Sequence, residues 1–174
     1  KRHTQFKKPD GGLYSEQLVS TEGFSSLYSL IYHVHPPTLV KSIDEAIDVN
    51  PTVVAQKNMQ HRSYLGFKIA AENDFLKSRK AVLVNNDVHI VLSAPKESTT
   101  KYFYKNSDAD EVIFVHEGTG TLKSIYGELK FSYGDYIVIP RGTIYQIFFD
   151  GDNNRLFIVE SFSPIVYPTR YRND

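Results

Sequence analysis

Two short blocks between Asp110 and Phe149 constrain the fold of this chain more than any other part of its sequence. The first block, DEVIFVHEGTG, places six residues between Glu111 and Gly118. The second, GDYIVIPRGTIYQIFF, separates Gly134 from Pro140-Arg141-Gly142 by five residues. Glycine and proline at fixed points around short apolar runs indicate tight turns between strands. The blocks therefore predict β-structure with turns in defined places.

Short apolar runs continue on both sides of these blocks, from residue 62 onward. Gly, Asn, Asp or Pro separates them at intervals of roughly ten residues, which is typical of an all-β sandwich or barrel. We expect hairpin loops at 85–87 and 150–152, a positive φ at Gly127, and helix only at 44–48 and 72–78. The runs are 64–70, 81–87, 88–95, 111–118, 121–131, 135–142, 143–149 and 155–162.

The first part of the chain has a different pattern. Turn residues dominate it, with one strand-like run from Leu27 to His35 that Pro36-Pro37 would end. We interpret residues 1–60 as an N-terminal arm and connecting segment laid across a barrel of residues 61–174. The chain of 174 residues would then be one domain.

Composition excludes several functions. Lys and Arg number 20 against 20 Asp and Glu, so there is no basic footprint for nucleic acid. Without cysteine there can be no disulfide, thiolate nucleophile or Cys-ligated zinc, which fits a cytoplasmic protein. No apolar run approaches the roughly 18 residues of a membrane span. Because the chain opens on Lys1 rather than Met, we expect it to be a piece of a longer protein.

The two blocks resemble the paired motifs of the cupin barrels. Metal-binding cupins carry G-x5-H-x-H-x3–4-E-x6-G in the first block and G-x5-P-x-G-x2-H-x3-N in the second. Residues two apart on a strand share a face, so three imidazoles and one carboxylate converge inside the barrel. Iron, manganese or zinc accepts such a set of ligands. The resemblance implies an all-β, cupin-like double-stranded β-helix, or jelly roll, with little helix.

The scaffold of the cupin motif is present in this chain, but its metal ligands are not. Counting back from Glu111, the His-x-His positions are either Lys105 and Ser107 or Tyr104 and Asn106. The third histidine position is Tyr145, and the asparagine position is Phe149. Glu111 and Tyr145 are therefore degenerate metal positions, and one carboxylate does not hold a metal. We expect no metal site here.

The histidines offer no replacement ligand set. His33 and His35 share a strand face, but no acid or third histidine stands at cupin spacing, so we favour a structural or surface role. His116 alternates with the face that carries Glu111, so it should point outward, under the N-terminal arm. We expect no function of the remaining three, which are isolated in sequence: His3, His61 and His89.

Two further groups have a functional and a structural interpretation. For Asp108, Asp110 and Glu111 the functional interpretation is an acid–base set, but we favour a solvated barrel rim. For five tyrosines the functional interpretation is a pocket for an aromatic ligand. Aromatic side chains commonly fill barrels and interfaces, and we favour that role. These tyrosines are Tyr102, Tyr104, Tyr133, Tyr136 and Tyr145.

Longer strings make the resemblance more specific, and together they look like the amino-terminal half of the homogentisate 1,2-dioxygenases. That family implies a non-haem Fe(II) enzyme that opens the ring of homogentisate with O₂. The product is maleylacetoacetate, in tyrosine and phenylalanine catabolism. Its iron ligands, two histidines and a glutamate, lie in the carboxy-terminal half, so we expect no catalytic residue and no Fe(II) in this chain. The strings are 2–11, 18–26, 32–38, 103–111, 134–136 and 139–142.

The same resemblance implies homo-oligomers, trimers that pair into hexamers. A loop of this half could then reach the iron pocket of a neighbouring subunit, with Tyr104 as the candidate substrate contact in trans. The isolated fragment should be inactive and should self-associate. Two alternatives stay open. One is a metal-free, epimerase-like cupin built on Tyr145 facing Glu111, although it lacks an inward histidine as base. The other is a cupin that binds a small molecule or has a structural role.

Overall fold

The computed structural model describes residues 4–37, 39–43, 45–54 and 60–171. The chain divides into two compact units, residues 1–49 and 50–174. The first unit contains an antiparallel hairpin of β1 (Ser15–Glu22) and β2 (Ser25–His33), with Leu18 opposite Leu30. The sequence predicted β2 but not β1, because the string SEQLVSTE has too few large apolar residues to stand out as a strand.

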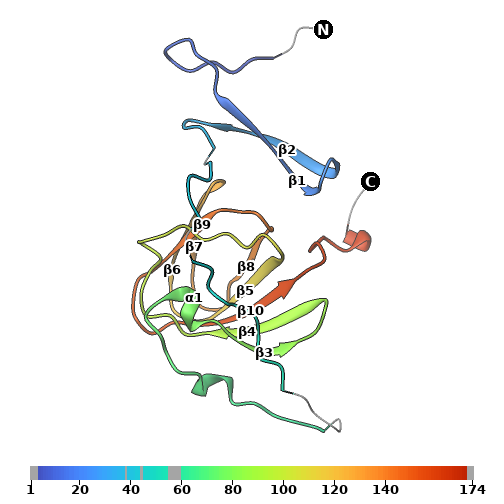
Figure 1. Cartoon of the computed structure of the whole chain (residues 1–174), viewed down its shortest axis with the longest axis vertical. Coiled ribbons are helices and arrows are strands. Elements are labelled where there is room, and N and C mark those ends of the chain that lie inside the picture. The colour runs from blue at the N-terminus through green and yellow to red at the C-terminus, as the bar shows by residue number, and fades with distance from the viewer. Residues whose placement is uncertain (1–3, 38, 44, 55–59, 172–174) are drawn as a thin grey trace. The chain divides into compact units, whose positions relative to one another are not determined.

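Two antiparallel sheets form the second unit (Figure 1). One has five strands in the order β3-β4-β10-β5-β8 and the other has three in the order β7-β6-β9. The five-stranded sheet comprises β3 (Lys80–Val84), β4 (Val88–Ser93), β10 (Arg155–Ser161), β5 (Asp110–Glu117) and β8 (Tyr136–Ile139). The three-stranded sheet comprises β7 (Gly127–Phe131), β6 (Gly120–Ser124) and β9 (Tyr145–Phe149).

Both sheets turn one face toward a shared core. Along β5 the side chains of Glu111, Ile113 and Val115 are fully buried, while those between them are only partly buried. This alternation follows from the two-residue period of a strand. Ile147 from β9 and Leu122 from β6 close the core from the other sheet. The predicted all-β, cupin-like jelly roll is therefore confirmed.

Helix is scarce in the described part of the chain. It consists of α1 (Phe75–Ser78) and two single turns of 3-10 helix at Gly66–Lys68 and Thr169–Tyr171. Asp74 caps α1 by accepting a hydrogen bond from the amide of Lys77, which agrees with the acid-rich start expected for 72–78. Among these residues no helix is long and apolar enough to cross a membrane.

Three local predictions were wrong. Residues 64–70 do not form a strand, because the 3-10 turn lays Phe67 against the ring of His116 instead of pairing with a sheet edge. No helix forms at 45–48, since one acid-rich turn cannot offset the cost of helix nucleation. Position 44 lies outside the described residues. The segment 150–152 does not close a hairpin, because β9 and β10 belong to different sheets.

Other turn predictions were correct. Asn85 accepts hydrogen bonds from the amides of Asp87 and Val88, which closes the β3–β4 hairpin. Gly127 has a φ of 121° after the tight β6–β7 turn. Among the block glycines, Gly142 has a φ of 78°, and its amide donates to the carbonyl of Asn106. That hydrogen bond ties the loop before β5 to the second block.

Candidate functional site

The site begins with a carboxylate inside the barrel. Glu111 lies on β5 with the same orientation as Ile113 and Val115, and it is 0% exposed. An ionised carboxylate in an apolar core is strongly unfavourable unless it is paired and hydrogen-bonded. The partners of Glu111 therefore decide what this position can do.

Both oxygens of Glu111 accept hydrogen bonds from other side chains. Nη2 of Arg79 donates to Oε1 over 2.6 Å, and the hydroxyl of Tyr145 donates to Oε2 over 2.8 Å. Arg79 directly follows α1, where its amide bonds the carbonyl of Leu76, and it precedes β3. The end of the short helix thus places the guanidinium of Arg79 inside the barrel, although the sequence around Arg79 is largely polar.

A second carboxylate lies on the neighbouring strand. Glu160 on β10 is directly opposite Glu111 on β5, and His89 on β4 is directly opposite Glu160. Like charges at such positions repel one another. The same Nη2 of Arg79 also contacts Oε1 of Glu160, so one nitrogen bridges both carboxylates. On the far side, Nδ1 of His89 lies 3.4 Å from Oε2 of Glu160.

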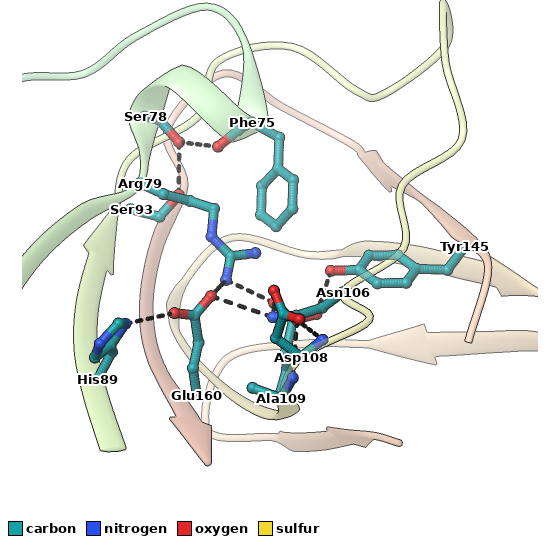
Figure 2. A network of polar contacts seen from close by, with 11 residues as sticks. Phe75, Ser78, Arg79, His89, Ser93, Asn106, Asp108, Ala109, Tyr145 and Glu160 are labelled. Atoms are coloured by element: carbon teal, nitrogen blue, oxygen red, sulfur yellow. Dashed lines mark hydrogen bonds and ion pairs between the residues drawn. The ribbon is translucent and has the colours of Figure 1, made fainter. Parts of the chain in front are cut away.

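Asn106 supplies a further pair of donors, and Figure 2 shows its position beside the bridge. Its Oδ1 accepts from the amides of Asp108 and Ala109, at 3.1 Å and 3.0 Å. This fixes the side-chain amide so that Nδ2 faces the carboxylates. Nδ2 lies 3.5 Å from Oε1 of Glu111 and 3.4 Å from Oε1 of Glu160. The amide therefore reinforces the bridge made by Arg79.

Aromatic rings enclose the guanidinium. Its central carbon lies 5.4 Å from the ring centroid of Phe75 and 5.3 Å from that of Tyr104. Both distances are within the range of cation–π attraction. Tyr104 meets Tyr145 edge-on at 5.4 Å between centroids, and the two backbones exchange a pair of hydrogen bonds. The rings exclude water and so strengthen the ion pairs beside them.

The charges of the cluster follow from its environment. Burial opposes the charge of Arg79, but Glu111, together with the other nearby acidic groups, outweighs it and holds the Arg79 pKa above its ordinary value. Burial, followed by the charge of Glu111, raises the pKa of the Tyr145 hydroxyl well above its ordinary value. Burial likewise raises the pKa of Tyr104, although the charge of Arg79 opposes the shift. Both phenols are therefore neutral near pH 7, and Tyr145 acts as a donor.

The degenerate metal positions converge in the structure. The His-x-His pair has two possible alignments. In one, the residues are Tyr104 and Asn106, which contact the cluster of Arg79, Glu111 and Glu160; in the other, they are Lys105 and Ser107, which are exposed. The remaining positions, Glu111 and Tyr145, are joined to each other directly. Phe149, the last of them, packs on Phe131 away from the carboxylates.

These residues do not fit an iron ion. Glu111 is the one carboxylate among the four converging positions, and both of its oxygens already accept from donors. The two tyrosines are neutral phenols, and Asn106 turns its amide nitrogen toward the centre. Across the part of the chain that the structure describes, no group of three or more His, Cys, Asp or Glu residues is arranged to hold a metal.

Sequence reasoning missed Arg79, the residue that organises the site. Its neighbours, in the string ENDFLKSRK, give no motif, and its two carboxylate partners, Glu111 and Glu160, are 32 and 81 residues away in the chain. The one available signal was indirect: an inward Glu111 without metal ligands needs a positive partner. His89 was also missed, since it was expected to have no role but lies beside Glu160.

The expected solvated rim is wrong for two of its three acids. Asp108 is exposed, but Asp110 is 7% exposed and Glu111 is 0% exposed. Asp110 is used structurally: Oδ1 accepts from the amide of Arg141 over 2.9 Å, and Oδ2 accepts from the amide of Ile165 over 2.7 Å. It therefore ties the second block and the chain after β10 to the start of β5.

The five tyrosines do not line one pocket. Tyr145 is buried in the core, and Tyr102 donates to Oδ2 of Asp74 over 2.8 Å. Tyr133 and Tyr136 are 72% and 70% exposed. Of the five, Tyr104 and Tyr145 pack on each other, with the ring of Tyr104 against the guanidinium of Arg79 and the hydroxyl of Tyr145 on Glu111.

The other histidines have structural surroundings. Nε2 of His33 lies 2.8 Å from Oε1 of Gln17 across the β1–β2 hairpin, and His35 and His61 are exposed. His3 lies outside the described residues. His116 is on the outer face of β5, as predicted, where it stacks edge-on with Phe67 at 4.6 Å. A cavity of about 230 Å³ beside it is lined almost entirely by apolar atoms.

A family model and a curated relative match most or all of this chain. The family model described as homogentisate 1,2-dioxygenase N-terminal matches residues 6–169. A protein of Saccharolobus solfataricus named "Putative dioxygenase SSO1533" is 38% identical over 174 residues, all of this chain but 44% of the relative. The chain thus spans less than half the length of that relative.

Solved structures with a similar backbone include cupin proteins. A cupin-2 domain protein from Shewanella frigidimarina is 23% identical, with a TM-score of 0.42 over 48% of this chain and 79% of that one. A conserved protein from Streptococcus pyogenes is 14% identical, with a TM-score of 0.47 over 63% of this chain and 95% of that one.

Proposed function

The chain belongs to the homogentisate 1,2-dioxygenase N-terminal family, and from this premise we propose that it is the amino-terminal cupin half of a homogentisate 1,2-dioxygenase. The whole enzyme would use Fe(II) and O₂ to open the ring of homogentisate to maleylacetoacetate, in the catabolism of tyrosine and phenylalanine. We place the Fe(II) ligands outside this chain, in the remainder of the longer protein. The absence of cysteine fits a reducing, cytoplasmic setting.

The buried contact between Glu111 and Arg79 is the observation that supports placing the Fe(II) site outside this chain. The positions that hold a metal in other cupins here surround an ion-paired guanidinium, which binds strands and loop together. That arrangement supports a role of this half in architecture and assembly. It gives no support to the epimerase-like alternative, because Glu111 and Tyr145 are 0% and 1% exposed and their polar atoms are engaged with each other.

A role in assembly also fits the outer face of the five-stranded sheet. Leu83 on β3, and Val138 and Tyr136 on β8, lie on the two edge strands and are 54%, 52% and 70% exposed there. Exposed apolar side chains on a sheet can mark a protein–protein contact. We propose that the whole enzyme is a homo-oligomer, a trimer or a hexamer. In such an assembly Tyr104 would contact homogentisate in the iron pocket of a neighbouring subunit.

The division between the two halves is tested by comparing this chain with the full product of its gene. Both proteins are reconstituted with Fe(II) and ascorbate, and oxygen uptake is followed with homogentisate and, as a control, with gentisate, which lacks the side-chain methylene. We expect the full product to take up one O₂ per homogentisate. The chain alone should neither retain stoichiometric iron nor consume oxygen.

Two outcomes would overturn the proposal. If this chain alone retained one iron and showed homogentisate-dependent oxygen uptake, the catalytic centre would lie within it. If the iron-loaded full product left homogentisate untouched, the proposed substrate would be wrong.

A further inference from the structure

The metal positions of this barrel surround a cation that belongs to the protein itself. Nη2 of Arg79 contacts Oε1 of Glu111 and Oε1 of Glu160, with the amide of Asn106 and the ring of Tyr104 beside it. We propose that Arg79 is the resident cation of the barrel, a guanidinium that takes the structural place of the metal ion. This inference concerns the fold of this half and does not depend on which substrate the whole enzyme uses.

The charge of the cluster requires a cation at this point. Glu111 and Glu160 are directly opposite each other on adjacent strands, and their side chains are 1% and 16% exposed. Two carboxylates so placed repel strongly in a medium of low dielectric constant. Here the guanidinium of Arg79, which contacts both carboxylates, removes that repulsion. The retention of Glu111 without histidine ligands thus has a physical reason.

Guanidinium suits this site better than ammonium does. It is planar, so it can pack beside the edge-on pair of rings of Phe75 and Tyr104, whose centroids are 6.1 Å apart, while its edge faces the two carboxylates. Nη1 of Arg79 is buried without a hydrogen-bond partner among the described residues. The cluster therefore holds Arg79 by charge and ring contact at one edge of the guanidinium, rather than by pairing each of its N–H groups.

The cation is also closed off from solvent. The side chain of Arg79 is 9% exposed, and α1 lies directly before it in the chain. A small cation from solution can enter only when the arginine side chain has been removed. Arg79→Ala should therefore leave a cavity that is shaped and charged for a guanidinium ion, and this consequence can be measured.

The test is chemical rescue of Arg79→Ala by guanidinium chloride near 10 mM, far below the molar concentrations that unfold proteins. Binding at about ten times its dissociation constant should raise the unfolding temperature of the variant by about 3–5 °C. Urea, which has the same shape without the charge, and tetramethylammonium chloride, which has the charge without the shape, should have no effect at the same concentration.

Wild-type protein and Arg141→Ala serve as matched controls, since Arg141 also contacts a carboxylate, that of Asp110, but with its side chain 36% exposed. Neither should respond to guanidinium. If urea raised the unfolding temperature of Arg79→Ala as much as guanidinium does, or if no additive raised it, the cluster would not be a cation site and the proposal would fail.

If Arg79→Ala does not fold in buffer, its refolding yield is measured instead, with and without 10 mM guanidinium, beside Arg79→Lys. On the order of a tenfold higher yield with guanidinium supports the proposal. Arg79→Lys, which keeps a tethered cation, should fold without the additive. An Arg79→Ala yield that guanidinium leaves unchanged would overturn it.

Discussion

The hydroxyl of Tyr145 donates a 2.8 Å hydrogen bond to Oε2 of Glu111, and both residues are at most 1% exposed. This contact joins the three-stranded sheet to the five-stranded sheet through the polar centre of the barrel. Because the pair is closed to solvent, its contribution should appear in stability, and not in the binding of a small molecule to the isolated chain.

Tyr145→Phe removes the hydroxyl and leaves Oε2 of Glu111 without its donor. Loss of a buried hydrogen bond to a charged group should lower the free energy of unfolding by about 1.5–3 kcal/mol. Urea denaturation measures this change. Tyr136→Phe is the control, since Tyr136 is 70% exposed and its change should lie within about 0.5 kcal/mol. Equal stabilities of Tyr145→Phe and the wild type would show that the contact does not stabilise the fold.

Stability should fall at alkaline pH because burial raises the pKa of Tyr104 and of Tyr145 in the folded protein. In the unfolded chain both phenols ionise near pH 10. Below that pH both phenols are neutral in the folded and in the unfolded state, and their contribution to the free energy of unfolding is fully present. Above it the unfolded state loses protons first, so the free energy of unfolding should drop by up to about 1.4 kcal/mol per pH unit for each tyrosine.

Urea titrations between pH 8 and 11 measure this slope. The double variant Tyr104→Phe/Tyr145→Phe should be less stable at pH 8 but should have a shallower decline above pH 10. A slope equal to that of the wild type would mean that other groups cause the alkaline loss.

Gly120 at the start of β6 is expected to tolerate no side chain. A Cβ there would lie 2.0 Å from the carbonyl oxygen of Phe148 and 2.7 Å from the ring of Phe131. Gly120→Ala should therefore lower the free energy of unfolding by more than about 2 kcal/mol, because backbone must move. Gly151→Ala is the matched control, as nothing lies within 4 Å of its Cβ and the change should be near zero. Similar unfolding temperatures for the two variants would contradict the prediction.

Tyr104→Phe tests the proposed substrate contact in trans. The change keeps the ring on Arg79 and removes the hydroxyl alone. In the full-length oligomer, loss of one hydrogen bond to homogentisate should raise KM by about five- to tenfold, with a smaller effect on kcat. Tyr126→Phe, in the exposed β6–β7 turn, should leave both constants unchanged. Unaltered affinity and turnover in Tyr104→Phe would exclude the contact.

Much of the fold could be predicted from the sequence because its signals are local. In a strand such as β5, buried and partly buried residues alternate along the chain, and turn glycines such as Gly127 lie where a positive φ is needed. The 3-10 turn at Gly66–Lys68 was predicted as a strand, because Phe67 and Ile69 alternate like strand residues while they cover a sheet face from outside. Local pattern does not distinguish these two ways of burying apolar side chains.

The site could be predicted only in part. The motif spacing indicated Glu111 and Tyr145 as residues facing the centre of the barrel, and it offered Tyr104 and Asn106 as one of two alignments. It gave no means of choosing between the alignments, because the loop before β5 takes its course from hydrogen bonds such as that between Gly142 and Asn106. Glu160 and His89 were not singled out, since only strand pairing places Glu160 beside Glu111 and His89 beside Glu160.

The sequence by itself determined the jelly-roll scaffold and the loss of the histidine ligands, because both depend on residue type and spacing along one strand or turn. What replaces the metal was decided only by the tertiary structure. Arg79 comes from the end of a short helix, Glu111 from β5 and Glu160 from β10, and no spacing rule relates them. They meet because adjacent strands place two carboxylates side by side in the core, and a buried pair of like charges is stable only with a cation between them.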